Sequence, residues 1–89
     1  MPTNLQLSDV QVWTLSNCSA CESAKQLLDE HGVSYETKSL DDPETKELFF
    51  MRFPNIRSVP QISIAGTRIG GLKELKKYID DNTKTTEVV

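Results

Sequence analysis

The sequence predicts an α/β fold in which the elements follow in the order β-α-β-α-β-β-α and build a four-stranded mixed sheet with helices on its faces. In the first half of the chain, short β-favouring runs alternate with helical patterns. In the second half, two short strand patterns flank a tight turn and precede a last helix. The predicted strands are 10–15, 33–40, 59–65 and 67–69, and the predicted helices are 19–31, 43–53 and 72–82.

The first three elements form a predicted βαβ unit. The first strand runs directly into the first helix, which ends at His31-Gly32, and the second strand follows at once. Such crossovers are right-handed and place the two strands parallel. Ser19 and Glu22 also fit a capping box at the start of this helix.

The other two predicted helices carry clear local signals. Asp42 is a typical N-cap, Pro43 suits the first helical position, and Pro54 ends the second helix. The apolar residues of that helix point in too many directions for one buried stripe, so we expect at least one of them to be exposed: Leu48, Phe49, Phe50, Met51 and Phe53. The residues predicted to face the core from the last helix are Leu72, Leu75, Tyr78, Ile79 and Asn82.

The 89 residues suffice for one small domain, which we place at 10–82, between a lead-in at 1–9 and a tail at 83–89. The opening residues lack the basic and apolar regions of a signal peptide, and no apolar run approaches the roughly 20 residues that cross a bilayer. We therefore expect a soluble, cytoplasmic protein without a membrane partner. A net charge of −3 with only 10 Lys and Arg argues against a nucleic-acid-binding surface.

Cys18 and Cys21 lie at the junction of the first strand and the first helix. The first-turn amides of a helix are unpaired and its start carries partial positive charge, so a thiolate is stabilised there over a thiol. Cysteine pKa values fall from about 8.5 to roughly 3.5–7.5 at such places. Cys21 lies one turn further along, on the core side. We therefore predict that Cys18 attacks a substrate disulfide and that Cys21 resolves the resulting mixed disulfide.

The cysteine pair has two other interpretations. The cysteines could be free and buried, or they could form half of a zinc site. A closed zinc site needs two further ligands, whereas the sequence has one histidine, His31, and no second cysteine pair. Cytosolic thiols are normally kept reduced, and C-x-x-C beside a βαβ pattern is a redox signature. We therefore predict a redox pair and no metal.

The Val59-Pro60 bond before the third strand has two interpretations. A trans bond would make Pro60 an ordinary proline at the start of an edge strand. A cis bond beside the cysteines would leave the N–H and C=O of Val59 free to pair with an extended peptide. The residues alone leave both open.

The chain carries three motifs in order: Cys18-Ser19-Ala20-Cys21, Ser58-Val59-Pro60-Gln61-Ile62 and Ile69-Gly70-Gly71. Together, over about residues 10–80, they resemble the dithiol glutaredoxins. The resemblance implies a three-layer, thioredoxin-like fold, a cis bond before Pro60 and a mixed disulfide that includes glutathione. It also implies a groove in which main-chain atoms pair with glutathione and a helix start receives its γ-glutamyl carboxylate. The residues implied for glutathione or substrate binding are Arg57, Ser58, Val59, Pro60, Gly70 and Gly71.

The chain departs from this family at three places. Ser19-Ala20 stands where the family usually has Pro-Tyr, so the ring that flanks glutathione is missing. Leu15 stands where a lysine usually meets the glycyl carboxylate. Lys73-Glu74 replaces the polar or acidic pair that usually follows the two glycines. These departures predict a low affinity for glutathione.

The resemblance leads us to expect a glutaredoxin, an enzyme that reduces protein and glutathione mixed disulfides with glutathione as its reducing co-substrate. We expect it to act as a monomer on disulfide-containing client proteins, with ribonucleotide reductase as a candidate client. Leu15 favours an alternative in which thioredoxin reductase recycles the protein. A third hypothesis follows from Ser19. Some dithiol glutaredoxins with serine at this position hold a [2Fe–2S] cluster between two subunits, and here Cys18 would be a ligand of such a cluster.

Overall fold

The computed structural model describes residue 7 and residues 9–83, and its elements follow the predicted order. They are β1 (Val10–Thr14), α1 (Ser19–Glu30), β2 (Glu36–Ser39), α2 (Pro43–Arg52), β3 (Gln61–Ile64), β4 (Thr67–Gly70) and α3 (Leu72–Thr83). The predicted fold class is therefore confirmed. Most of the predicted lead-in (1–9) and tail (83–89) lies outside the described residues.

The sheet has the strand order β2-β1-β3-β4. β1 pairs in parallel with β2, where Val12 lies opposite Thr37, and antiparallel with β3, where Val12 lies opposite Ile62. β3 and β4 form an antiparallel hairpin. Because the direction alternates from β1 to β3 to β4, the end of β1, the start of β3 and the end of β4 lie at the same end of the sheet. The three sequence motifs all fall at this end.

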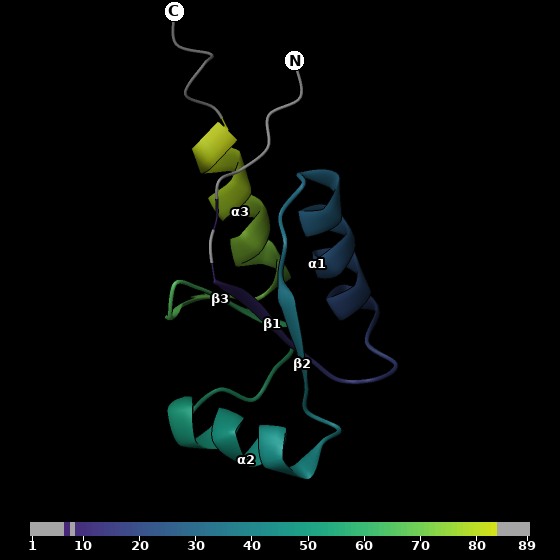
Figure 1. Cartoon of the computed structure of the whole chain (residues 1–89), viewed down its shortest axis with the longest axis vertical. Helices are drawn as coiled ribbons and strands as arrows, with labels where there is room; N and C mark the ends of the chain where they lie inside the picture. The colour runs from purple at the N-terminus through teal and green to yellow at the C-terminus, as the bar shows by residue number, and fades with distance from the viewer. Residues whose placement is uncertain (1–6, 8, 84–89) are drawn as a thin grey trace, which may run out of the picture.

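Helices cover both faces of the sheet, which gives three layers. Figure 1 shows α1 and α3 side by side on one face and α2 on the other. Residues of α1, α3, β1 and β3 form the larger core: Val10, Val12, Ala24, Leu28, Val33, Ile62, Leu75 and Ile79. Under α2, Trp13, Leu40 and Phe49 form a smaller core, in which the Trp13 and Phe49 ring centroids lie 5.4 Å apart. Successive residues of β1 point to opposite faces, so this strand contributes to both cores.

β2 is shorter than the predicted strand, which began at Val33. The chain leaves α1 through Gly32, whose φ is 68°. The N–H of Val33 then donates to the carbonyl of Leu28 at 3.0 Å. Val33 therefore completes the end of the helix and packs into the core, and pairing with β1 begins only at Glu36.

β3 is also shorter than predicted, by two residues at its start and one at its end. Pro60 has no N–H with which to join the ladder. At the other end Ala65 has a φ of 52° and Gly66 a φ of 84°, so both residues belong to the turn. This turn leads directly into β4, as the sequence predicts.

Local signals account for α2. The Asp42 carboxylate accepts a hydrogen bond from the N–H of Thr45 at 2.9 Å, and Pro43 occupies the first turn. Leu48 and Met51 are 56% and 71% exposed, which confirms that the apolar residues of this helix do not all face the core.

The core face of α3 is formed by Leu75 and Ile79, with Leu72 and Tyr78 half-buried beside them. The prediction that Asn82 belongs to this face is wrong. Asn82 is exposed, and its side-chain amide donates to the carbonyl of Tyr78 at 2.7 Å.

Candidate active site

Cys18 and Cys21 are joined by a disulfide at the point where β1 leads into α1, with their Cα atoms 5.2 Å apart. Cys18 is the N-cap residue of α1, in an extended conformation with φ −118° and ψ 103°. Its sulfur accepts a hydrogen bond from the N–H of Cys21 at 3.0 Å. The sulfur thus occupies the place that a capping oxygen usually takes, where a negative charge is stabilised by the helix start.

This arrangement corrects one prediction, because Ser19 does not cap the helix. Ser19 is its first helical residue, and the N–H of Glu22 donates to the carbonyl of Cys18 at 3.2 Å. The Glu22 carboxylate instead pairs with Lys25 at 2.9 Å. The helix start therefore depends on the redox residue itself.

The two cysteines differ in their exposure to solvent. Cys21 is 0% exposed and lies on the side of α1 that also buries Ala24 and Leu28. Cys18 is only partly buried. A reactant arriving from solvent can therefore reach the Cys18 sulfur, whereas Cys21 is reached through Cys18.

The Val59-Pro60 peptide bond is cis, which is the geometry that the resemblance implies. Because Trp13 lies opposite Gln61 in the β1–β3 ladder, Pro60 precedes β3 at the end of the sheet from which β1 leads to the cysteines. Within the described part of the chain, no hydrogen bond engages the main-chain N–H or C=O of Val59. Its main chain can therefore pair with an extended peptide.

Gln61 holds this loop in place, a role that the sequence did not reveal. Gln61 is 4% exposed, and its side-chain nitrogen donates to the carbonyl of Ser58 at 2.9 Å and to the Ser58 hydroxyl at 3.2 Å. Its side-chain oxygen accepts a hydrogen bond from Arg68 at 3.0 Å. Gln61 thus links the segment before Val59 to β4, and it orients the Arg68 guanidinium at the surface.

A hollow of about 410 Å³ brings together four of the predicted binding residues, Arg57, Ser58, Gly70 and Gly71. Gln61, Arg68 and Glu74, which were not predicted as binding residues, also line it. The hollow lies where the loop before β3 meets the start of α3. Arg57 and Arg68 contribute basic side chains to it, and Glu74 contributes an acidic one.

The two glycines that precede α3 are closely packed, Gly70 against the side chain of Glu74 and Gly71 against the main chain of Pro60. A Cβ on Gly70, whose φ is 128°, would lie 2.6 Å from Cγ of Glu74, and one on Gly71 would lie 3.1 Å from the carbonyl oxygen of Pro60. The N–H of Gly71 donates to Glu74 Oε1 at 2.9 Å, and this hydrogen bond is the main reason why the pKa of the Glu74 carboxyl lies below its usual value. The Gly71 amide, which the resemblance assigns to a ligand carboxylate, is thus bonded to a carboxylate of the chain itself.

A second, smaller hollow of about 120 Å³ shares Arg57 and Ser58 with the first. Val59 and Leu15 line it, together with residues of α2. Of the predicted site residues, Cys18, Cys21 and Pro60 line neither hollow.

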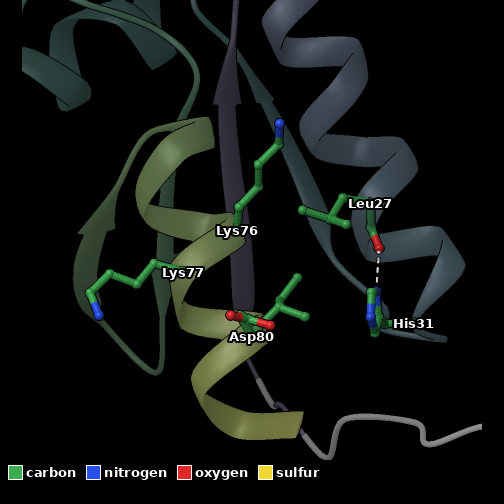
Figure 2. Close-up of a pocket in the computed structure, with 6 residues that line it drawn as sticks. Leu27, His31, Lys76, Lys77 and Asp80 are labelled. Atoms are coloured by element: carbon green, nitrogen blue, oxygen red, sulfur yellow. Dashed lines mark hydrogen bonds between the residues drawn. The ribbon is translucent and has the colours of Figure 1, made fainter. Parts of the chain in front are cut away.

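A third hollow, of about 480 Å³, lies between α1 and α3 and includes none of the predicted site residues. Figure 2 shows Leu27 on α1, His31 just after the end of α1, and Lys76 and Asp80 on α3 around it. The ring nitrogen Nδ1 of His31 lies 3.0 Å from the carbonyl oxygen of Leu27, so this histidine helps to end α1. Leu27 and His31 lie at the C-terminal end of α1, whereas Cys18 lies at its N-terminal end. The 12 residues of α1, each with a rise of about 1.5 Å, therefore separate this hollow from Cys18.

Within residues 7 and 9–83, no three His, Cys, Asp or Glu side chains group in a way that could hold a metal ion. None of the helices in this described range has the length and apolar character needed to span a membrane.

Fold and site together define a thioredoxin-like protein with a redox-active dithiol. The chain belongs to the glutaredoxin family, whose sequence profile matches residues 10–69. Glutaredoxin 1 of Rickettsia conorii is 36% identical over 91 aligned positions, which cover 90% of this chain and 89% of that protein. The chain is accordingly a thiol-disulfide oxidoreductase.

Solved structures agree. Glutaredoxin 1 from Francisella tularensis, in complex with cacodylate, superposes with a TM-score of 0.71 at 30% identity, covering 83% of this chain and 94% of that one. A buckwheat glutaredoxin in complex with glutathione also gives a TM-score of 0.71, at 25% identity, covering 86% of this chain and 73% of that one.

Proposed function

We propose that the protein reduces disulfides in client proteins, and mixed disulfides between proteins and glutathione, with glutathione as its reducing co-substrate. The observation that carries this proposal is the unequal burial of the two cysteines: Cys18 is only partly buried, whereas Cys21 is 0% exposed. A nucleophile must meet its substrate, whereas a resolving thiol needs only to reach the nucleophile. On the resemblance, the protein acts as a cytoplasmic monomer, with ribonucleotide reductase among its clients.

The reaction with a protein disulfide runs in two halves. The Cys18 thiolate attacks one sulfur of the client, the client disulfide breaks, and the other client sulfur leaves as a thiolate. Cys21 then attacks the Cys18 sulfur, which releases the second client thiol and forms the disulfide seen in the structure. The client gains two electrons and the protein loses them.

Two glutathione molecules return the protein to its dithiol form. The first attacks the Cys18 sulfur, forms a mixed disulfide with it and frees the Cys21 thiol. The second attacks the glutathione sulfur of this mixed disulfide and leaves as glutathione disulfide, which restores the Cys18 thiolate. With a protein mixed disulfide of glutathione, the Cys18 thiolate attacks the glutathione sulfur and the protein thiolate leaves. One glutathione then reduces the Cys18–glutathione disulfide as above, so this reaction requires Cys18 alone.

Three features support glutathione as the reductant. The main chain of Val59, to which no described residue is hydrogen-bonded, offers a partner for the tripeptide backbone. Arg57 and Arg68 line the neighbouring hollow and offer positive charge to a carboxylate. In addition, the similar buckwheat glutaredoxin was solved with glutathione.

The proposal is tested by following NADPH consumption in a coupled assay with glutathione, glutathione reductase and a glutathionylated peptide. We expect Cys18→Ser to abolish activity. Cys21→Ser should retain part of it, because the mixed-disulfide reaction does not use Cys21. Complete loss in Cys21→Ser, or activity in Cys18→Ser, would contradict the assigned roles.

A second electron source, thioredoxin reductase, is favoured by two observations. Leu15 cannot pair with the glycyl carboxylate of glutathione, and the Gly71 amide is bonded to Glu74. Both weaken binding of glutathione without affecting the dithiol. Incubating the oxidised protein with each recycling system separately decides between them, and the faster rate of Cys18–Cys21 reduction identifies the reductant.

A further inference from the structure

The side of α2 that points away from the sheet carries two acidic and two apolar side chains: Glu44, Glu47, Leu48 and Met51. We name it the outer α2 face. Its members are spaced at i, i+3, i+4 and i+7, so they lie together on one side of the helix. Leu48 is 56% exposed, Met51 is 71% exposed, and both glutamates are exposed. Figure 1 shows α2 alone on its side of the sheet, with no other described element over this face.

The core of the protein does not use the outer α2 face. Phe49 is 1% exposed and packs with Trp13 beneath the helix, and Phe53 contacts both rings one turn further along. Phe49 and Phe53 therefore fix which side of α2 meets the sheet. Single exposed apolar residues are common at protein surfaces. Leu48 and Met51, however, are neighbours on one helix face, and a methionine beside a leucine gives an adaptable apolar surface that a partner can cover.

The carboxylates of the outer α2 face lack a counter-charge. Among the described residues, neither Glu44 nor Glu47 has a cation within ion-pair distance. The two cations of α2 are used elsewhere: Lys46 lines the smaller hollow, and Arg52 donates to the Gly66 carbonyl at 3.2 Å. Glu44, in the first turn, also interacts favourably with the helix dipole. Glu47 lies beyond that turn, so its charge is available to a partner.

The start of α2 is tied to the loop that carries Cys18. The N–H of Ser16 donates to Asp41 Oδ2 at 3.0 Å. Ser16 lies two residues before Cys18, and Asp41 lies directly before the N-cap of α2. A protein bound to the outer α2 face is therefore held close to the redox site. None of the four residues of this face lines either hollow beside the Val59 loop.

We propose that the outer α2 face binds an amphipathic helix of a partner protein, in which an apolar stripe is flanked by Lys or Arg. Leu48 and Met51 pack against the apolar stripe, and Glu44 and Glu47 pair with the basic flank. A second copy of this chain fits less well, because two such faces would bring four carboxylates together. The inference goes beyond the proposed function, since it assigns a surface outside the redox site and depends on neither glutathione nor Cys18.

The test uses a fluorescent peptide of about 18 residues, long enough to form a helix, with a leucine stripe flanked by lysines and no cysteine. Matched peptides carry glutamine in place of the leucines or glutamate in place of the lysines. Fluorescence anisotropy measures binding to the oxidised protein, and amide chemical shifts of the isotope-labelled protein locate it. We expect the largest shifts on the outer α2 face and about tenfold weaker binding of both matched peptides. No binding, or shifts confined to other elements, would overturn the proposal.

Variants separate this face from a general attraction between an acidic protein and a basic peptide. Leu48→Gln should weaken binding about tenfold, whereas Leu15→Gln, at another exposed leucine outside the face, should leave it unchanged. Glu47→Gln should weaken binding several-fold at low salt, whereas Glu30→Gln, at an exposed glutamate of α1, should have little effect. Equal losses within either pair of variants would also overturn the proposal.

A second copy of the chain as the occupant would give a different result. The amide shifts of the outer α2 face would then change on dilution without any peptide, and Leu48→Gln would abolish that change. This outcome would overturn the assignment to a partner helix. A protein that binds the peptide but reduces no disulfide with glutathione would instead show that the proposed function is wrong and that this inference stands.

Discussion

Cys18 and Cys21 have the same side chain, and their different chemistry comes from their position on one helix turn. Cys18 caps α1 and receives the N–H of Cys21, whereas Cys21 is buried one turn deeper. Oxidation joins two groups that already lie within bonding reach, because the helix fixes their spacing. The difference between the two cysteines therefore follows from a strand that delivers Cys18 to the start of a helix.

Gln61 provides a test of the loop that carries Val59. Replacing it with alanine removes a buried amide and leaves the Ser58 carbonyl and the Arg68 guanidinium without this partner. We expect Gln61→Ala to lower the free energy of unfolding by about 1–3 kcal/mol. Urea denaturation measures the loss. Gln26→Ala, at an exposed position of α1, is the control and should stay within about 0.5 kcal/mol of wild type. Equal effects of the two changes would contradict this role.

Glu74 predicts a pH dependence of stability. The Gly71 N–H lowers the pKa of Glu74 from its usual 4.5, so the folded state favours the ionised carboxylate. This contribution is present above pH 4.5 and is lost as the pH falls through the lower pKa of the folded state.

Glu74→Gln should therefore be less stable than wild type at pH 7, and the difference should shrink below pH 4.5. Urea midpoints measured from pH 3 to pH 7 show the trend. A difference that is constant over this range would mean that the Glu74 charge does not contribute.

The C-x-x-C motif located the cysteines at the helix start, whereas the cis bond before Pro60 was implied only by the family resemblance, since the residues alone left it open. Sequence reasoning missed Gln61 and Arg68 as a pair because their contact joins two strands of a hairpin whose register the sequence does not specify. It also assigned the helix cap to Ser19, since S-x-x-E and C-x-x-C overlap in this stretch and only the backbone conformation of Cys18 decides between them.

At the scale of elements, helix ends were predicted within one residue where a special residue marks them. Gly32 ends α1 with a positive φ, and Asp42 begins α2 with a side-chain cap. Strand ends were less predictable. The β2 boundary depends on whether Val33 pairs with β1 or completes α1, and the alternating pattern of the sequence fits both.

Gly32 tests this view of α1. Alanine at a φ of 68° is strained by roughly 1–2 kcal/mol, so we expect Gly32→Ala to lower the free energy of unfolding by about that amount. Ser23→Ala, at an exposed interior position of the same helix, should be neutral or slightly stabilising, because alanine favours helix. Chemical denaturation of both variants gives the comparison. A Gly32→Ala protein as stable as Ser23→Ala would contradict the assignment.

At the scale of the whole molecule, β1 couples the two cores, with Val12 facing α1 and α3 and Trp13 facing α2. A defect in either core should therefore weaken the sheet end that carries the redox site. The order of elements allowed this three-layer arrangement to be predicted, whereas the hollows could not be, since they depend on contacts among loops from distant parts of the chain.

Phe49→Ala tests this coupling. It removes a ring that is 1% exposed, and we expect a loss of about 3–5 kcal/mol. Unfolding should remain a single transition when followed by helical circular dichroism and by Trp13 fluorescence. Met51→Ala, at a side chain that is 71% exposed, is the control and should change stability by less than about 0.5 kcal/mol. Two separate transitions in Phe49→Ala would show that α2 folds independently of the rest.

The central claim, a stabilised thiolate at Cys18, is tested most directly by alkylation of the reduced protein with iodoacetamide as a function of pH. Mass spectrometry after digestion assigns the label to Cys18 or Cys21. We expect Cys18 to reach its half-maximal rate at a pH clearly below the value of about 8.5 that is ordinary for a free thiol, while buried Cys21 reacts far more slowly. A Cys18 profile that matches a free thiol, or equal labelling of both cysteines, would contradict the account.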